Sequence, residues 1–229
     1  MKVAPMFGKL TSLQQRIITG AGIGLVFVGV FFLLPTFMFT LLLTIIFSVI
    51  AWYEWPPLFY WNNQFKQKLF WLITPVYLLL PFFCLTLMNY SNYRPLLIVL
   101  FLLVFVFDMA AYFTGTFLGK HKIAPTISPK KTWEGVLGGY LAIYAAVVCW
   151  LIWQGKDLNA DYILILCAFV AVLATLGDLF ESWLKRKAAV KDSGTFLPGH
   201  GGLLDRFDAL MFIAPVFYVC RVFLMHFFF

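Results

Sequence analysis

Apolar runs alternate with short polar connections along almost the whole chain. Cut at prolines and charged positions, the chain gives seven apolar segments, at about residues 17–34, 36–53, 69–88, 94–113, 134–153, 161–180 and 207–227. Most are about 18 to 21 residues long, which is the length of helix that crosses a hydrocarbon core of about 30 Å. The pattern therefore predicts an all-α polytopic membrane protein with about seven transmembrane helices.

Little more than Pro35 separates the first two segments. One helix over residues 17–53 would be about 55 Å long at about 1.5 Å per residue, which is too long for a bilayer. We therefore expect an N-terminal helical hairpin at 17–53. The first segment follows three basic residues but lacks a small-residue cleavage signal, so we interpret it as an uncleaved anchor.

Composition supports the membrane class. The chain is 62% hydrophobic and only 12% charged, which excludes the soluble globular, disordered and disulfide-rich classes. Its four cysteines lie singly, with no C-x-x-C spacing that would indicate zinc or a disulfide framework. The net charge of +7 is spread over short connections rather than one folded surface, so we expect no nucleic-acid partner.

The charged residues also predict an orientation. Fourteen of the 17 Lys and Arg residues fall on the N-terminal side of the alternating connections, which places the N-terminus in the cytosol and the C-terminus outside. Eight of the ten carboxylates lie on or near the same face. Because acidic residues contribute little to orientation, their placement needs another cause, and a polar site for cations and phosphates at the cytosolic face would supply one.

Two carboxylates stand apart in this pattern. Glu54 lies in WYEWPP at the end of the second segment, and we interpret it as an interfacial carboxylate that stays in water rather than as a catalytic group. Asp108 lies inside the fourth segment, about 8 Å from its cytosolic end, where a charge is costly. It is either a functional residue or an interhelical hydrogen bond, on a stripe with Tyr112, Gly115 and Gly119 that would let another helix approach closely.

The connection before the fifth segment reads SPKKTWEG. Ser128 followed by Pro129 has the chemistry of an N-cap and first helical position, so we expect the fifth helix to begin there. Lys130, Lys131 and Thr132 would then lie in its first turn, where free N–H groups and lysines suit phosphate. Alternatively, the lysines only enforce the topology.

The largest polar stretch covers residues 177–208 and holds five of the ten carboxylates. Asp178, Glu181, Ser182 and Lys185 lie at offsets of 0, 3, 4 and 7, which puts them on one helix face. Residues 192–202 are rich in glycine and should leave the helix. Such a stretch is either a metal and phosphate site with all-oxygen ligands suited to Mg²⁺, or simply a solvated connection.

The run SWLKRKAAVKDSGTFLPGHGGLLDRFD at 182–208 resembles the signature of the phosphatidate cytidylyltransferases, also called CDP-diacylglycerol synthases. DMAAYFTGTFLGK at 108–120, SPKKTWEG at 128–135, QQRIITG and WYEW resemble the same family. The resemblance implies one integral membrane catalytic domain over 1–229, with its signature in a core at 94–227. It also implies a bacterial-type inner (cytoplasmic) membrane. The region at 54–95 is shorter than in longer relatives, so the helix count there and a homodimer contact stay open.

The reaction implied by the resemblance transfers CMP from CTP to phosphatidic acid in phospholipid biosynthesis, by direct in-line displacement at the cytosolic membrane boundary. Mg²⁺ is the implied cofactor, a second cation being left open, and its expected ligands are Asp178, Asp205 and Asp208. The expected catalytic residues are these three aspartates, Lys185 and Arg186. The expected substrate-binding residues are Ser182, Lys191, Asp192, His200, Gly201, Gly202, Arg206, Ser128, Lys130, Lys131, Thr132 and Asp108. A CTP-dependent lipid kinase of the polyprenol type and a non-enzymatic transporter or scaffold are the alternatives.

Overall fold

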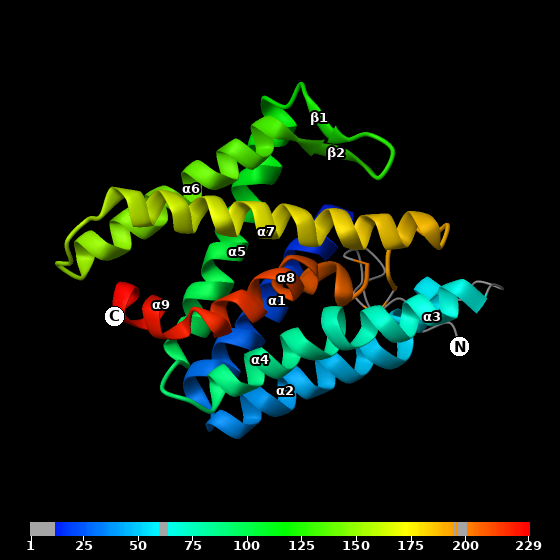
Figure 1. Ribbon diagram of the computed structural model, residues 1–229, viewed down its shortest axis with the longest axis horizontal. Helices are drawn as coiled ribbons and strands as arrows, with labels where there is room; N and C mark the ends of the chain where they lie inside the picture. The colour runs from blue at the N-terminus through cyan, green and yellow to red at the C-terminus, as the bar shows by residue number, and fades with distance from the viewer. Residues whose placement is uncertain (1–11, 60–63, 195, 197–200) are drawn as a thin grey trace.

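A computed structural model describes residues 12–59, 64–194, 196 and 201–229. The described chain is mostly helical, and each predicted apolar segment coincides with helical structure (Figure 1). The elements in order are α1 (Ser12–Leu33), α2 (Thr36–Val49), the π-helix η1 (Ile50–Glu54), the 3₁₀-helix η2 (Pro56–Phe59), α3 (Gln64–Ile73), the π-helix η3 (Thr74–Leu79), α4 (Leu80–Asn89), α5 (Pro95–Phe117), β1 (Lys122–Ala124), β2 (Ser128–Thr132), α6 (Trp133–Trp153), α7 (Ala160–Lys187), α8 (Leu204–Val219) and α9 (Arg221–Phe228).

Membrane-spanning capacity is close to the prediction. Within the described residues, five helical segments are long and apolar enough to cross a bilayer, and there are six when the bent pair of α8 and α9 is counted as one span. The described apolar part of α1, Gly24–Leu33, is shorter. The chain therefore has the all-α polytopic architecture that its hydrophobic pattern predicts.

The helix expected to begin at Ser128 begins instead at Trp133, so that prediction was wrong. Residues 128–132 form strand β2, which pairs antiparallel with β1. Thr132 is the N-cap of α6, and its hydroxyl accepts a hydrogen bond from the N–H of Gly135 at 3.2 Å. Both Ser128 and Thr132 carry N-cap chemistry, and packing decides between them because Thr132 fits against Gly115, where a Cβ would lie 3.0 Å from its hydroxyl oxygen.

The last apolar segment is also not one straight helix. It begins at Leu204 and bends by 88° between α8 and α9. The guanidinium of Arg221 donates to the carbonyl of Tyr218 at 2.8 Å, satisfying the end of α8. The end of α9 is held by donors from the α6–α7 region, where Lys156 donates to the His226 carbonyl at 2.8 Å and Trp150 to the Phe228 carbonyl at 3.1 Å. These long-range contacts stabilise a bend that the apolar pattern does not encode.

Small residues bring two helix pairs into close contact. Gly135 of α6 lies against Gly115 of α5, as the small-residue stripe predicts, although Tyr112 on that stripe is exposed. A Cβ on Gly177 of α7 would lie 2.5 Å from the carbonyl oxygen of Asp208. In Figure 1, α7 runs across the molecule with α8 beside it, and the β1–β2 hairpin lies at one end of α6. α7 and α8 therefore approach each other closely next to Asp178.

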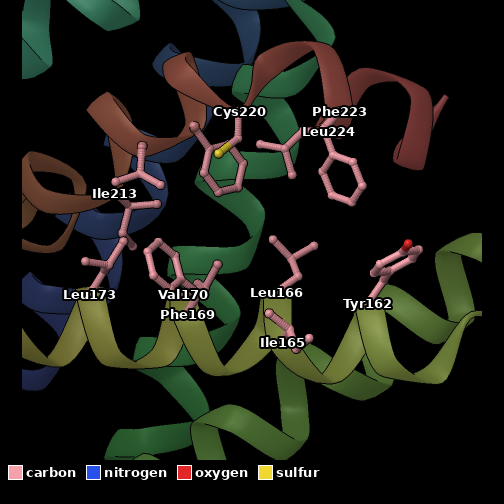
Figure 2. Close-up of a pocket in the computed structure, with 12 residues that line it drawn as sticks. Tyr162, Ile165, Leu166, Phe169, Val170, Leu173, Ile213, Cys220, Phe223 and Leu224 are labelled. Atoms are coloured by element: carbon pink, nitrogen blue, oxygen red, sulfur yellow. The ribbon is translucent and has the colours of Figure 1, made fainter.

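A cavity of about 150 Å³ lies between α7, α8 and α9 (Figure 2). Its lining is apolar and includes Phe169, Leu173, Ile213 and Phe223, with no charged side chain. Phosphate chemistry needs charged or hydrogen-bonding partners, so this cavity is not the reaction site. The polar residues gather elsewhere on α7 and α8.

Candidate functional site

Polar side chains from β2, α5, α7 and α8 converge on Lys131. Its ammonium group forms an ion pair with Asp178 of α7. Burial lowers the pKa of Lys131 to about 8, whereas the nearby carboxylates of Asp208, Asp108 and Glu181 act in the opposite direction. Residues separated by up to 100 positions in the sequence thus share one electrostatic environment, as the sequence predicts for Asp108, Lys131 and the polar stretch.

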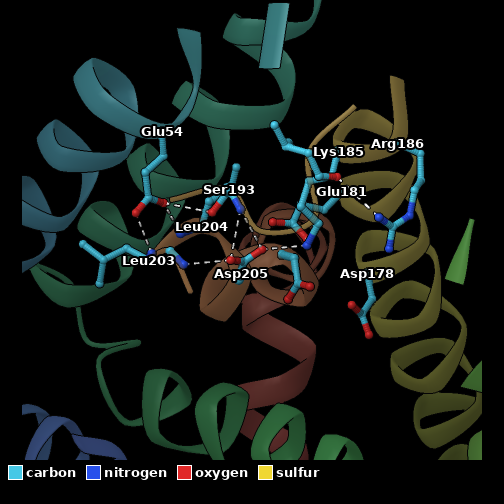
Figure 3. A network of polar contacts seen from close by, with 12 residues as sticks. Glu54, Asp178, Glu181, Lys185, Arg186, Ser193, Leu203, Leu204 and Asp205 are labelled. Atoms are coloured by element: carbon cyan, nitrogen blue, oxygen red, sulfur yellow. Dashed lines mark hydrogen bonds and ion pairs between the residues drawn. The ribbon is translucent and has the colours of Figure 1, made fainter. Parts of the chain in front are cut away.

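A buried ion network ties α7 to the start of α8. Lys185 donates to Glu181, one turn earlier, and to Asp205 Oδ1 at 2.6 Å (Figure 3). The Glu181 side chain is 0% exposed, and within the described residues its Oε1 has no hydrogen-bond partner. The sequence placed Glu181 on the same face as Asp178 but did not predict it as a site residue. Its spacing of four from Lys185 was the available signal.

Asp205 holds together Ser193 and Gly202, which lie on either side of the undescribed part of the glycine-rich loop. Its Oδ2 accepts hydrogen bonds from the N–H groups of Gly202 at 2.8 Å and Ser193 at 3.2 Å. Gly201 adopts a φ of 82°, in the left-handed region that favours glycine. The carboxylate predicted as a metal ligand is therefore already bonded to Lys185 and to the loop backbone.

Glu54 is buried, so its interpretation as a solvated carboxylate was wrong. It is 2% exposed and accepts hydrogen bonds from the N–H groups of Leu203 and Leu204 and from the hydroxyl of Ser193 (Figure 3). Sequence placed it correctly at the end of the second segment. Its burial depends on the loop that packs over it from about 150 positions away, which no local pattern reveals.

The other predicted site residues lie around this centre in different roles. Arg186 donates from Nε to the carbonyl of Ile127 at 3.2 Å, so it links α7 to the β1–β2 hairpin. Asp108 is exposed and lies near Lys131, on whose pKa its carboxylate acts; its functional role stays a prediction. The half-buried or buried members of the set are Ser128, Thr132, Ser182, Gly201 and Gly202, and the exposed ones are Lys130, Lys191, Asp192 and Arg206. His200 lies outside the described residues.

The fit to Mg²⁺ differs among the predicted ligands. No group of three or more His, Cys, Asp or Glu side chains in the described parts of the chain is close enough to hold a metal ion. Asp178 and Asp208 lie on the two helices that touch at Gly177, and both offer the oxygen ligands that Mg²⁺ prefers. Asp205 is committed to Lys185 and the loop. Asp178 is itself paired with Lys131, so the two-carboxylate and the three-aspartate ligand sets both stay predictions.

A protein-family model described as the cytidylyltransferase family matches residues 62–224. The chain belongs to the cytidylyltransferase family. The matched range contains Asp108, the β1–β2 hairpin, α7 and the start of α8, whereas Glu54 lies before it. The matched range thus includes most of the residues that form the polar centre, but not Glu54.

Several curated proteins are similar in sequence to half of the chain. The chain is 45% identical over 116 residues to a phosphatidate cytidylyltransferase of Staphylococcus haemolyticus, covering 51% of the chain and 45% of the relative. It is 47% identical over 119 residues to one of Thermotoga maritima, covering 50% and 44%. A third, from Staphylococcus saprophyticus, is 44% identical over 116 residues. The alignments to these members of the cytidylyltransferase family span less than half of each relative's length.

Lys131 should make the free energy of unfolding of this cytidylyltransferase-family protein change with pH in the alkaline range. Its pKa is lowered from 10.5 to about 8 in the fold, so between these values the unfolded chain binds more protons than the folded one. The contribution of Lys131 to the free energy of unfolding therefore rises with pH from about 8 to 10.5. We expect the free energy of unfolding of wild type to rise over this range relative to that of Lys131→Arg, because the arginine stays protonated.

The measurement is denaturant unfolding in detergent from pH 7 to 10.5, with a chelator present so that no divalent cation binds Asp178. Lys130→Arg serves as the matched control, because Lys130 is the exposed neighbour on the same strand. Parallel stability curves for wild type and Lys131→Arg would show that Lys131 keeps its ordinary pKa.

Proposed function

We propose that this member of the cytidylyltransferase family transfers CMP from CTP to phosphatidic acid, giving CDP-diacylglycerol and pyrophosphate. The observation that carries the proposal is the family match, which spans the charged residues converging on Lys131. The proposed substrate class is that of the relatives at 44 to 47% identity, which are phosphatidate cytidylyltransferases.

The reaction requires two anions to meet. A phosphate oxygen of phosphatidic acid bonds to the α-phosphorus of CTP, while the bond from that phosphorus to the bridging oxygen breaks and its electron pair leaves with pyrophosphate. Little covalent chemistry is required of the protein, so catalysis consists mainly of positioning and charge stabilisation. A cluster of lysines and carboxylates supplies both.

The residues divide this work. Lys131 and the exposed Lys130 would hold the lipid phosphate beside the N-terminus of α6, whose free N–H groups also favour anions. Lys191 and Arg206, exposed on either side of the loop, would bind the nucleotide phosphates. Asp178 and Asp208 would hold Mg²⁺, which when bound neutralises phosphate charge and stabilises the leaving pyrophosphate. Lys185 and Asp205 keep α7 and the loop in register.

Location supports the same chemistry. Phosphatidic acid keeps its acyl chains in the bilayer, whereas CTP is soluble, so the reaction must occur where the helices leave the membrane. Asp178 lies near the carboxyl end of α7, and Asp205 and Asp208 lie in the first turns of α8. The distribution of Lys and Arg favours a cytosolic position for this end.

The deciding experiment supplies purified protein in detergent micelles with phosphatidic acid, Mg²⁺ and CTP labelled in the α-phosphate, and then asks whether label enters the extracted lipid. We expect lipid labelling together with release of unlabelled pyrophosphate. A parallel reaction with γ-labelled CTP identifies the kinase alternative, since a kinase transfers that phosphate and releases CDP. Absence of any CTP-dependent lipid product contradicts the proposed function and favours a transporter or scaffold.

A further inference from the structure

We propose that Glu54 is a positioning residue for the nucleotide half of the site, holding the loop around Ser193 and the start of α8 in the geometry that CTP binding needs. The proposal rests on the proposed function. It assigns a role to the end of the second helix, which precedes the matched family range of 62–224. The N-terminal helices would then be part of the reaction site rather than only a membrane anchor.

Glu54 provides the N-terminal cap that α8 lacks. The N-cap position of α8, Leu203, makes no side-chain cap hydrogen bond. Instead, Glu54 Oε1 accepts from Leu203 N at 2.8 Å and Oε2 accepts from Leu204 N at 2.7 Å. A carboxylate at this end satisfies free N–H groups and interacts favourably with the helix dipole. The first turns of α8 carry Asp205 and Asp208, so this cap sets where both carboxylates stand.

The loop is shaped to the Glu54 carboxylate. A Cβ on Gly194 would lie 2.8 Å from Oε1, and a Cβ on Gly202 would lie 2.7 Å from Oε2. Distances below 3.0 Å are too short for a real Cβ, so both glycines permit a contact that a larger residue would prevent. Gly194 and Gly202 thus permit the close approach of the loop to Glu54.

Ser193 connects Glu54 to the charged residues of the site. Its hydroxyl donates to Glu54 Oε2 at 3.2 Å, while its N–H donates to Asp205 Oδ2 at 3.2 Å (Figure 3). Asp205 in turn accepts from Lys185, which also donates to Glu181. A shift of Glu54 is therefore transmitted to α7 and α8 through direct hydrogen bonds.

Glu54 is itself held rigidly. It is the last residue of the π-helix η1. Helical turns of this type are rare in proteins, and those that occur often lie at functional sites. The next residue, Trp55, is 1% exposed, donates from Nε1 to Thr74 at 2.8 Å and stacks on Tyr77 at 5.3 Å between ring centroids. Both of these partners belong to the second π-helix, η3. The two π-helices η1 and η3 thus pack against each other next to the Glu54 carboxylate.

The test compares Glu54→Gln with wild type by steady-state kinetics and thermal unfolding. Glutamine keeps the size of the side chain but replaces one acceptor with a donor, which faces an N–H or hydroxyl group in the loop. We expect the KM for CTP to rise about 10- to 100-fold and the KM for phosphatidic acid to change little, since the lipid phosphate is assigned to β2. Glu54→Asp, which keeps both acceptors, should recover part of the CTP affinity.

Asn89→Ala is the matched structural control. Asn89 is a buried residue that ties α4 to α2 through Thr36 and Thr40, away from the loop. The Asn89→Ala substitution should lower the melting temperature without changing the KM for CTP. If Glu54→Gln behaves in the same way, with a lower melting temperature and an unchanged KM, the positioning role is wrong and Glu54 only stabilises the fold.

Amide hydrogen exchange separates this proposal from the proposed function. The N–H groups of Leu203 and Leu204 should be protected in wild type and should lose protection in Glu54→Ala, whatever the substrate. A wild-type protein that transfers no label would contradict the proposed function, and the exchange result would then still decide whether Glu54 holds the loop. Equal exchange in both proteins overturns the inference directly.

Discussion

Replacing Asp208 with asparagine is expected to lower the rate of CMP transfer about 10²- to 10³-fold, through loss of several kcal/mol of charge stabilisation in the transition state. Asp208 is 8% exposed, and one oxygen accepts the N–H of Ala209 at 2.8 Å. Asparagine preserves the size of the side chain and that acceptor while removing the charge. The fold should therefore survive, and the loss should appear in kcat and in the dependence of the rate on Mg²⁺ concentration.

Asp157→Asn provides the control, because Asp157 is an exposed carboxylate in the loop before α7, at the opposite end of that helix from Asp178. It should leave the rate and the Mg²⁺ dependence unchanged. Steady-state rates at several Mg²⁺ concentrations, with melting temperatures for all three proteins, complete the comparison. If Asp208→Asn kept full activity and normal metal dependence, the assignment of Asp208 to Mg²⁺ would fail.

Replacing Lys185 with methionine is expected to lower the free energy of unfolding by about 3–5 kcal/mol, the cost of leaving a buried charge without its partner. The side chains involved are almost completely enclosed, with exposed fractions of 12% for Lys185, 0% for Glu181 and 10% for Asp205. An exposed ion pair would contribute only about 0 to 1 kcal/mol. Burial therefore places this network among the interactions whose disruption has a large effect.

Denaturant unfolding in detergent measures this loss. Lys187→Met is the matched control, because Lys187 is an exposed lysine at the end of the same helix, and it should change stability by no more than about 0.5 kcal/mol. The double variant Lys185→Met with Glu181→Gln should regain part of the lost stability, since it removes one of the two unpaired carboxylates. Equal stability of Lys185→Met and Lys187→Met would contradict a stabilising role for the network.

Hydrophobic pattern alone located every long helix of the described chain. A helix that crosses a bilayer must be apolar over a defined length, so composition and punctuation were sufficient for α5, α6 and α7. The site was predicted in part from the same information. Helical spacing put Asp178 and Lys185 on one face of α7, and the high cost of an intramembrane charge singled out Asp108.

Local signals were insufficient where two alternatives had similar chemistry. Ser128 and Thr132 are both good N-cap residues, and pairing with β1 together with packing against Gly115 selects Thr132. The bend after α8 depends on donors from Arg221 and Lys156, the latter about 70 positions from its acceptor. In both places the energy that decides comes from residues distant in sequence.

The sequence by itself determined the class of the protein, the positions of its helices and several of the charged residues that gather around Lys131, because bilayer thickness and helical periodicity act on contiguous residues. Only the tertiary structure decided how those charges are divided. It pairs Lys131 with Asp178, encloses Glu181 with Lys185, commits Asp205 to the loop and places Glu54 at the start of α8. Burial and hydrogen bonding between distant segments determine these pairings, and neither is a property of any single stretch of sequence.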